Sequence, residues 1–186
     1  LAALRRAAAA GRIGAVAPRF HGAPTNRSQR ATLADGAEIV ARCRDDAVDA
    51  AVLVANCPVC HQTMSLIARL LEESGVASVV MGCARDIVEH VGVPRFVFSD
   101  FPLGNAAGRP RDPVSQDATL ALALDLLETA AAPRTTVQSP LRWSESASWK
   151  LDYCNVARLA PGEIARRRAA FDEGKAQAKA LREAEP

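Results

Sequence analysis

Two cysteines separated by two residues, Cys57 and Cys60, are the side chains of this chain best suited to chemistry. An apolar run at residues 50–55 precedes them and indicates a buried parallel strand, and apolar residues at helical spacing follow over 58–74. The pair therefore lies where a strand delivers the chain to a helix N-terminus, and the dipole and free N–H groups there stabilise a thiolate. This spacing favours a redox pair in which Cys57 attacks a substrate and Cys60 resolves the intermediate as a disulfide.

Other chemistry is compatible with the same two cysteines. A structural zinc site needs two further ligands, and His61 and Cys83 would have to supply them, because the sequence has no second Cys-x-x-Cys. Residues 57–61 also match the Cys-x-x-Cys-His pattern of covalent haem attachment, although their place inside a βαβ pattern argues against haem. Two buried structural cysteines, or a soft metal ion such as copper or zinc at Cys57 and Cys60, are further alternatives. We identify no cofactor motif.

More polar side chains are expected near the same place. Parallel strands present their carboxyl ends at one edge of the sheet, and ligands bind there. Cys83 directly follows the predicted strand 77–82, and Asp100 ends the predicted strand 95–100. A loop rich in glycine and proline, 101–113, comes next. The residues expected to shape a substrate pocket at this edge are Asp100, Asn105, Arg109, His21 and Cys83.

Each of these residues has a stated role and an alternative. Asn105 and Arg109 could bind a carboxylate or phosphate of the substrate, or could belong to a plain connecting loop. His61 is predicted to be catalytic as a proton donor near the sulfurs, with a helix-surface residue as the alternative. His21 follows a predicted strand end and could face the same edge, whereas Cys83 could be a small buried cysteine.

The alternation of strands and helices predicts the fold class. We expect an α/β fold with three αβα layers, right-handed βαβ units and a mostly parallel sheet, Rossmann-like or flavodoxin-like. The α/β domain should cover residues 1–142, and residues 143–186 should form a partly helical C-terminal extension. An Ala-rich helical pattern is already under way at Leu1, so we expect the chain to begin inside a longer protein. The predicted strands are a short one within 11–18, then 50–55, 77–82, 95–100 and 135–139, and the main predicted helices are 29–46, 58–74, 84–90 and 114–129.

Composition narrows the partners. A net charge of +2, with scattered basic residues and few aromatics, gives no case for nucleic acid or membrane binding. The five cysteines, an odd number with one tight pair, do not suit a secreted disulfide framework, so we expect a cytoplasmic protein. A polar C-terminal helix near Trp143 and Trp149 suggests an interface and a homo-oligomer.

The pair and its surroundings resemble the selenoprotein B family of glycine, sarcosine, betaine and D-proline reductases. The resemblance implies that Cys57 stands at the selenocysteine position and Cys60 at the partner cysteine. It also implies reductive cleavage of a C–N bond, in which a pyruvoyl group on a separate subunit activates the substrate. This chain has sulfur where that family has selenium. The segments that carry the resemblance are 11–14, 55–60, 87–94, 98–105, 134–137 and 141–143.

The leading hypothesis is therefore a thiol-dependent reductase that acts on a small amino-acid-like molecule. A thiol reductant system would reset the pair, and a partner reductase subunit is expected. The alternatives are a soft-metal binding protein, an electron-relay subunit without turnover of its own, and a racemase in which Cys57 and Cys83 face each other across a substrate.

Overall fold

The computed structural model describes residues 1–152 and 155–184. It comprises two compact units, residues 1–143 and residues 144–186. The first unit carries the sheet and all of the predicted site residues. In its described residues, the second unit has short helical segments and one long helix. Each unit is described by itself.

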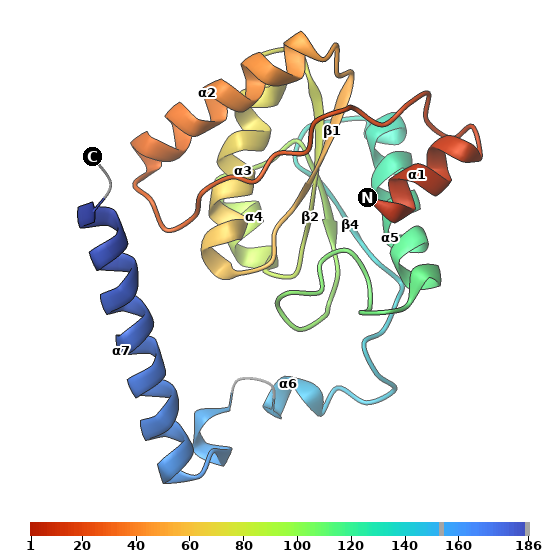
Figure 1. Cartoon of the computed structure of the whole chain (residues 1–186). Helices are drawn as coiled ribbons and strands as arrows, with labels where there is room; N and C mark the ends of the chain where they lie inside the picture. Colours follow the sequence, from red (N-terminus) through yellow and green to blue (C-terminus); the bar gives the residue numbers. More distant parts are fainter. Residues whose placement is uncertain (153–154, 185–186) are drawn as a thin grey trace. The chain divides into compact units, whose positions relative to one another are not determined.

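A four-stranded, all-parallel sheet forms the centre of the first unit (Figure 1). The strands follow one another across the sheet in chain order, and their valine-rich sequences suit a surface that is covered on both faces. Val54 is paired with Met81, and Gly82 with Phe98, so the carboxyl ends of the strands lie at one edge. The strands are β1 (Ala50–Val54), β2 (Ala77–Gly82), β3 (Arg95–Phe98) and β4 (Thr135–Gln138).

Helices cover both faces of this sheet, as the sequence predicts for a three-layer α/β fold. One face carries α2, α3 and α4, and the other carries α1 and α5 (Figure 1). Local signals start these helices, since Ser28 caps α2, Cys57 caps α3 and Asp112 caps α5. The helices are α1 (Ala2–Ala9), α2 (Gln29–Asp45), α3 (Pro58–Glu73), α4 (Arg85–Val91) and α5 (Pro113–Thr129).

The core has two halves because successive strand residues point to opposite faces. Val80 and Phe96 pack with Ile67 of α3 on one face. Val79, Val97 and Ala123 of α5 pack on the other. The inner strand β2 is buried along almost its whole length, so its carboxyl end lies inside the first unit, near the start of α3.

The connection from β3 to β4 departs from the expected handedness. The chain moves in one direction across the sheet from β1 to β4, while α3 and α4 lie on one face and α5 lies on the other. The crossover through α5 therefore has the opposite hand to the crossovers through α3 and α4. The expectation of uniformly right-handed βαβ units is wrong here, because the long loop 99–112 carries the chain over the carboxyl edge to the far face.

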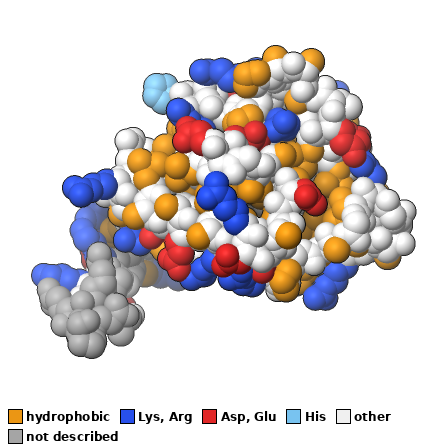
Figure 2. Space-filling model, turned by 90° about the horizontal axis from the view of Figure 1, so that it is seen from above, with side chains coloured by type: hydrophobic (Ala, Val, Ile, Leu, Met, Phe, Trp, Pro, Cys, Tyr) orange, Lys and Arg blue, Asp and Glu red, His pale blue; other side chains and the backbone are white. Residues whose placement is uncertain are grey.

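The second unit consists of α6 (Trp149–Asp152), a 3₁₀ turn (Val156–Arg158) and α7 (Pro161–Ala184). Near the start of α7, Glu163 forms ion pairs with Arg166 and Arg167 one turn further on. No described helix is both long and apolar enough to span a bilayer. Figure 2 shows basic and acidic side chains interspersed with hydrophobic ones on the face that it presents.

The core assignment predicts a large difference between two truncations. Ile67 is 1% exposed on α3, and Val114 is 78% exposed on α5. Ile67→Ala should lower the free energy of unfolding by about 2–5 kcal/mol, because it removes buried contacts and leaves a cavity. Val114→Ala should change it by less than about 0.5 kcal/mol. Urea unfolding followed by circular dichroism measures both; equal effects would contradict the packing of α3 on the sheet.

Candidate functional site: a cysteine pair at the start of helix α3

Cys57 and Cys60 lie on the first turn of α3, where β1 hands the chain over to the helix. Cys57 is the N-cap residue, and its sulfur accepts the backbone N–H of Cys60 at 3.2 Å. The two residues form a disulfide with their Cα atoms 4.9 Å apart. Both are half-buried. The arrangement places one sulfur against a free helix N–H and within bonding reach of the other, which is what a dithiol–disulfide couple requires.

His61 is fully buried directly behind the pair, so the helix-surface alternative for it is wrong. Its Nδ1 lies 2.7 Å from the Cys57 carbonyl oxygen. Its Nε2 accepts the backbone N–H groups of Cys83 and Ala84 at 2.8 and 3.1 Å. Since a carbonyl can only accept and an N–H can only donate, the ring is the neutral tautomer with its proton on Nδ1.

The surroundings of His61 hold it neutral. Burial lowers its pKa from the ordinary 6.5, and this outweighs the opposing effects of the Cys57 carbonyl and of the Asp86 carboxylate. Both ring nitrogens are occupied by backbone groups. The described contacts therefore favour a positioning role for His61, and its predicted role as a proton donor to the sulfurs stays a prediction.

Gly82 makes room for the imidazole at the end of β2. A Cβ placed on Gly82 would lie 2.7 Å from His61 Cδ2, 2.8 Å from His61 Nε2 and 3.2 Å from Phe96 Cε2. Any larger residue would push the ring away from the two N–H donors. Sequence reasoning missed Gly82, although a glycine at the end of a buried apolar strand, directly before a cysteine, is a signal of close approach.

Cys83 and the loop after β3 meet at the same edge. Burial raises the pKa of the Cys83 thiol to about 11, although backbone N–H groups of Asn105 and Phe101 lower it in part. The negative charge of Asp100 acts on the same thiol and raises its pKa further. The structure therefore brings Cys83, Asp100 and Asn105 close together, with Cys83 held as a thiol at neutral pH.

The polar side chains of the loop are used to hold it in place. Asn105 donates to the Pro102 carbonyl at 3.0 Å. Arg109 donates to the Arg142 carbonyl and lies 3.5 Å from the Asp112 carboxylate. Asn105 and Arg109 thus stabilise the loop in this structure, and carboxylate or phosphate binding by them stays a prediction. Phe101, packed edge-on against Trp143 with ring centroids 5.4 Å apart, anchors the loop as well.

The structure does not bring His21 to this edge. No strand precedes it in the structure, and its charge acts on Asp46, the C-cap of α2. Asp46 lies just before β1 begins, at the opposite end of the sheet from Cys57. The expected strand before His21 is an irregular segment, and this difference moves the residue away.

A metal set of Cys57, Cys60, His61 and Cys83 does not form in the described part of the chain. No group of three or more His, Cys, Asp or Glu side chains is placed there to hold a metal ion. Both cysteines of the pair are bonded to each other, and His61 would have to give up a backbone bond to ligate a metal.

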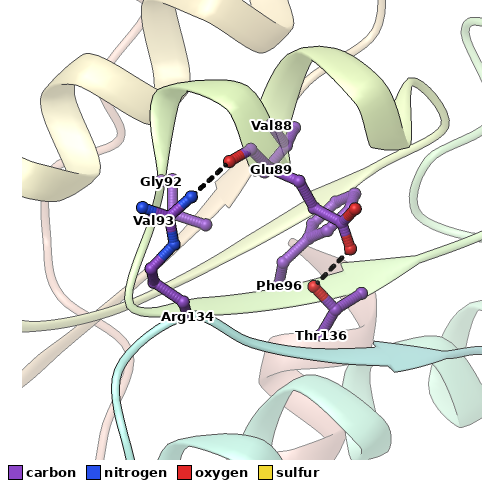
Figure 3. Close-up of a pocket in the computed structure, with 7 residues that line it drawn as sticks. All are labelled: Val88, Glu89, Gly92, Val93, Phe96, Arg134 and Thr136. Carbon is purple, nitrogen blue, oxygen red and sulfur yellow. Dashed lines mark hydrogen bonds between the residues drawn. The ribbon is translucent and has the colours of Figure 1, made fainter.

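A separate cavity of about 210 Å³ lies between α4 and strands β3 and β4. Val88, Val93 and Phe96 form apolar parts of its lining (Figure 3). Arg134 donates to the Glu89 carbonyl at 2.9 Å, and Thr136 donates to the Glu89 carboxylate at 2.9 Å. These bonds fasten the C-terminal end of α4 to β4. None of the predicted site residues lines this cavity.

Comparison with known proteins gives one similarity. Over 83 residues, the chain is 34% identical to D-proline reductase subunit gamma of Acetoanaerobium sticklandii. The match covers 45% of this chain and 34% of that subunit, so the chain spans about a third of the relative's length. No family model matches, and no solved structure matches. The similarity links the chain to a subunit of a reductase, and the narrower selenoprotein B resemblance stays a prediction.

The neutral, buried His61 predicts a pH dependence of stability. Its pKa is lower in the folded protein than the 6.5 of the unfolded chain, so the unfolded state takes up a proton first as the pH falls. The contribution of His61 is fully present above pH 6.5 and is lost below it, by up to about 1.4 kcal/mol per pH unit. His61→Gln should remove this part of the slope between about pH 7 and 5, whereas replacement of the exposed His90 by Gln should retain it. Chemical denaturation at each pH measures the slope, and a parallel loss in the His90 variant would contradict the assignment.

The close approach of Gly82 predicts a second effect. Gly82→Ala should cost about 1–3 kcal/mol of stability, because the new methyl group displaces the imidazole or Phe96. Gly14→Ala is the matched control, since a Cβ there would meet nothing within 4 Å. Thermal unfolding of both variants tests this, and a Gly82 variant as stable as the Gly14 variant would mean that His61 is not held against β2.

Proposed function

We propose that this chain is a thiol-dependent component of a reductase, in which Cys57 is the nucleophile and Cys60 the resolving thiol. The observation that carries the proposal is the Cys57–Cys60 pair itself. The two residues are half-buried, their sulfurs are within bonding reach, and the Cys57 sulfur accepts an N–H of the first helical turn. The similarity to a subunit of D-proline reductase supports a reductase and suggests a small amino-acid-like substrate. Since that relative is one subunit of a reductase, a partner subunit is part of the proposal.

The proposed reaction balances with the two thiols as the electron source. The Cys57 thiolate attacks the carbon next to the substrate nitrogen, a C–S bond forms, and the nitrogen leaves with the C–N electron pair as an amine after taking up a proton from water. The Cys60 thiolate then attacks the Cys57 sulfur, so that a disulfide forms and the carbon leaves with the C–S electron pair and takes up a proton. An external dithiol reduces the disulfide and closes the cycle. The setting is an intracellular thiol pool, in keeping with the expected cytoplasmic location.

The residues around the pair would have supporting roles. Cys83, with its pKa raised to about 11, is a poor nucleophile at neutral pH and would form part of the pocket wall. Asp100 and the backbone of the loop 99–112 would bound the substrate on the other side. Asn105 and Arg109 would act by keeping this loop in place, because Asn105 bonds within it and Arg109 ties it to the Arg142 carbonyl.

A second candidate is an electron-relay subunit with the same pair. The observation that favours it is the engagement of Asn105 and Arg109 with protein groups, which uses part of their hydrogen-bonding capacity. A relay subunit passes electrons from a thiol reductant to a partner enzyme and needs no substrate pocket of its own.

The proposal predicts an order of thiol reactivity in the reduced protein. Cys57 should have a pKa well below the ordinary value of about 8.5 and should be alkylated first at pH 7. Cys43 and Cys83 should react slowly, because burial raises the pKa of both. Iodoacetamide labelling over a pH series, with mass-spectrometric assignment, measures the order, and a glutathione redox titration shows whether the pair forms a reversible disulfide.

Variants separate the two candidate functions. Cys57→Ser should abolish both the fast alkylation and the disulfide, and Cys43→Ala should leave both unchanged. With D-proline and dithiothreitol, a reductase would cleave the ring C–N bond and release a primary amine, which an amine reagent detects. A reversible disulfide without amine from the chain alone would show that cleavage requires the partner subunit, whereas release of amine by the chain alone would exclude the relay. Two slowly reacting thiols of ordinary pKa would contradict both.

A further inference from the structure

We propose that His61 is the positioning residue of the cysteine pair: its imidazole fixes the first turn of α3 against the turn after β2 and so keeps the Cys60 N–H directed at the Cys57 sulfur. The inference deepens the proposed function, because it assigns what tunes the pair. No motif of the sequence assigns this role, and the described contacts carry it.

The Cys57 carbonyl is held by His61 through both its backbone and its ring. This oxygen accepts two hydrogen bonds from one residue, the backbone N–H of His61 at 3.0 Å and the ring Nδ1–H at 2.7 Å. The backbone bond is the ordinary bond that opens an α-helix, whereas the ring bond is additional. Together they fix the peptide plane that follows Cys57, and with it the direction from which the Cys60 N–H approaches the sulfur.

The Nε2 side of the ring is held by the turn after β2. Nε2 accepts two backbone N–H groups, from Cys83 and Ala84, which are held by the end of β2 and the entry to α4. Two donors on Nε2 polarise the imidazole and make Nδ1–H a stronger donor to Cys57. Gly82 lets the ring approach β2, and the ring is wholly buried, so its orientation is set by packing as well as by hydrogen bonds.

The position of the His61 imidazole affects the stability of the Cys57 thiolate. A thiolate at the N-cap of a helix is stabilised by the dipole and by the N–H groups of the first turn, and this effect falls off when the turn frays. Without the imidazole, the Cys57 carbonyl and the two N–H groups after β2 lose their common partner. The Cys57 thiolate should then be less stable, and the disulfide correspondingly harder to reduce.

The test compares three forms of the full chain in the reduced and oxidised states: wild type, His61→Leu and His61→Gln. The side-chain amide of glutamine presents a donor and an acceptor about as far apart as the two ring nitrogens, so it can keep both sets of bonds. His61→Leu should raise the pKa of Cys57 by about half a unit to one unit, a three- to tenfold loss of thiolate at pH 7. The dithiol–disulfide equilibrium in glutathione buffer should shift about tenfold towards the disulfide, and His61→Gln should restore most of both changes.

The outcomes separate this inference from the proposed function. A folded His61→Leu protein that is destabilised, yet has the wild-type Cys57 pKa and glutathione equilibrium, would show a purely structural histidine and overturn the inference while the reductase proposal stands. A wild-type Cys57 of ordinary pKa would overturn the reductase proposal instead. His90→Gln is the control, because this exposed histidine lies outside the bonds that hold the pair, and it should change neither quantity.

A second measurement does not depend on whether the leucine variant folds. Nitrogen-15 NMR of the imidazole distinguishes its two tautomers and its protonated form. In wild-type protein at pH 7 we expect the neutral tautomer with the proton on Nδ1, in both the reduced and the oxidised state. A proton on Nε2, or a doubly protonated ring, is incompatible with the bonds to Cys83 and Ala84 and would overturn the inference.

Discussion

The interaction on which the site depends is made by the neutral imidazole of His61, which links the ends of two strands through hydrogen bonds to backbone groups. His61 donates to the carbonyl of Cys57 and accepts N–H groups from Cys83 and Ala84. The turn after β1 and the turn after β2 therefore have one common partner, buried between them. A buried polar group is costly unless all of its hydrogen-bonding capacity is used, and here the ring has no unsatisfied nitrogen. The close approach that these bonds require explains the glycine at position 82, and the burial that comes with it lowers the pKa of His61.

The second constraint is the path of the chain between β3 and β4. Because α5 lies on the opposite face from α3 and α4, the chain must pass over the carboxyl edge of the sheet, and the loop 99–112 makes that passage. The loop is held by bonds within it, by Arg109 to the Arg142 carbonyl and by the ring contact of Phe101 with Trp143. The loop 99–112 thus lies at the edge of the sheet where parallel sheets bind ligands, and the cysteine pair lies at the same edge.

The sequence predicted the fold and the position of the pair well, because both depend on local patterns. The apolar runs at β1 and β2 and the proline after Cys57 specify a strand, a turn and a helix start within a few residues. The environment of His61 was not predictable in this way. Whether a histidine one turn into a helix faces solvent or the core depends on the residue opposite, here Gly82 of the next strand, and single-sequence periodicity does not report that contact. The hand of the last crossover was not predictable for a similar reason, since a loop of this length can lead the chain to either face of the sheet.

The loop side chains show why residue type alone misleads about binding. Arginine and asparagine beside a strand end resemble an anion site, yet backbone carbonyl groups near a sheet edge also need donors. Asn105 donates to a carbonyl within the loop, and Arg109 donates to the Arg142 carbonyl beyond it. The groups of this chain that are suited to chemistry are sulfurs: one pair at a helix start, and the half-buried Cys83 thiol of raised pKa nearby. A centre of that kind supplies electrons and a nucleophile, whereas recognition of a charged substrate needs groups that are free to bind it.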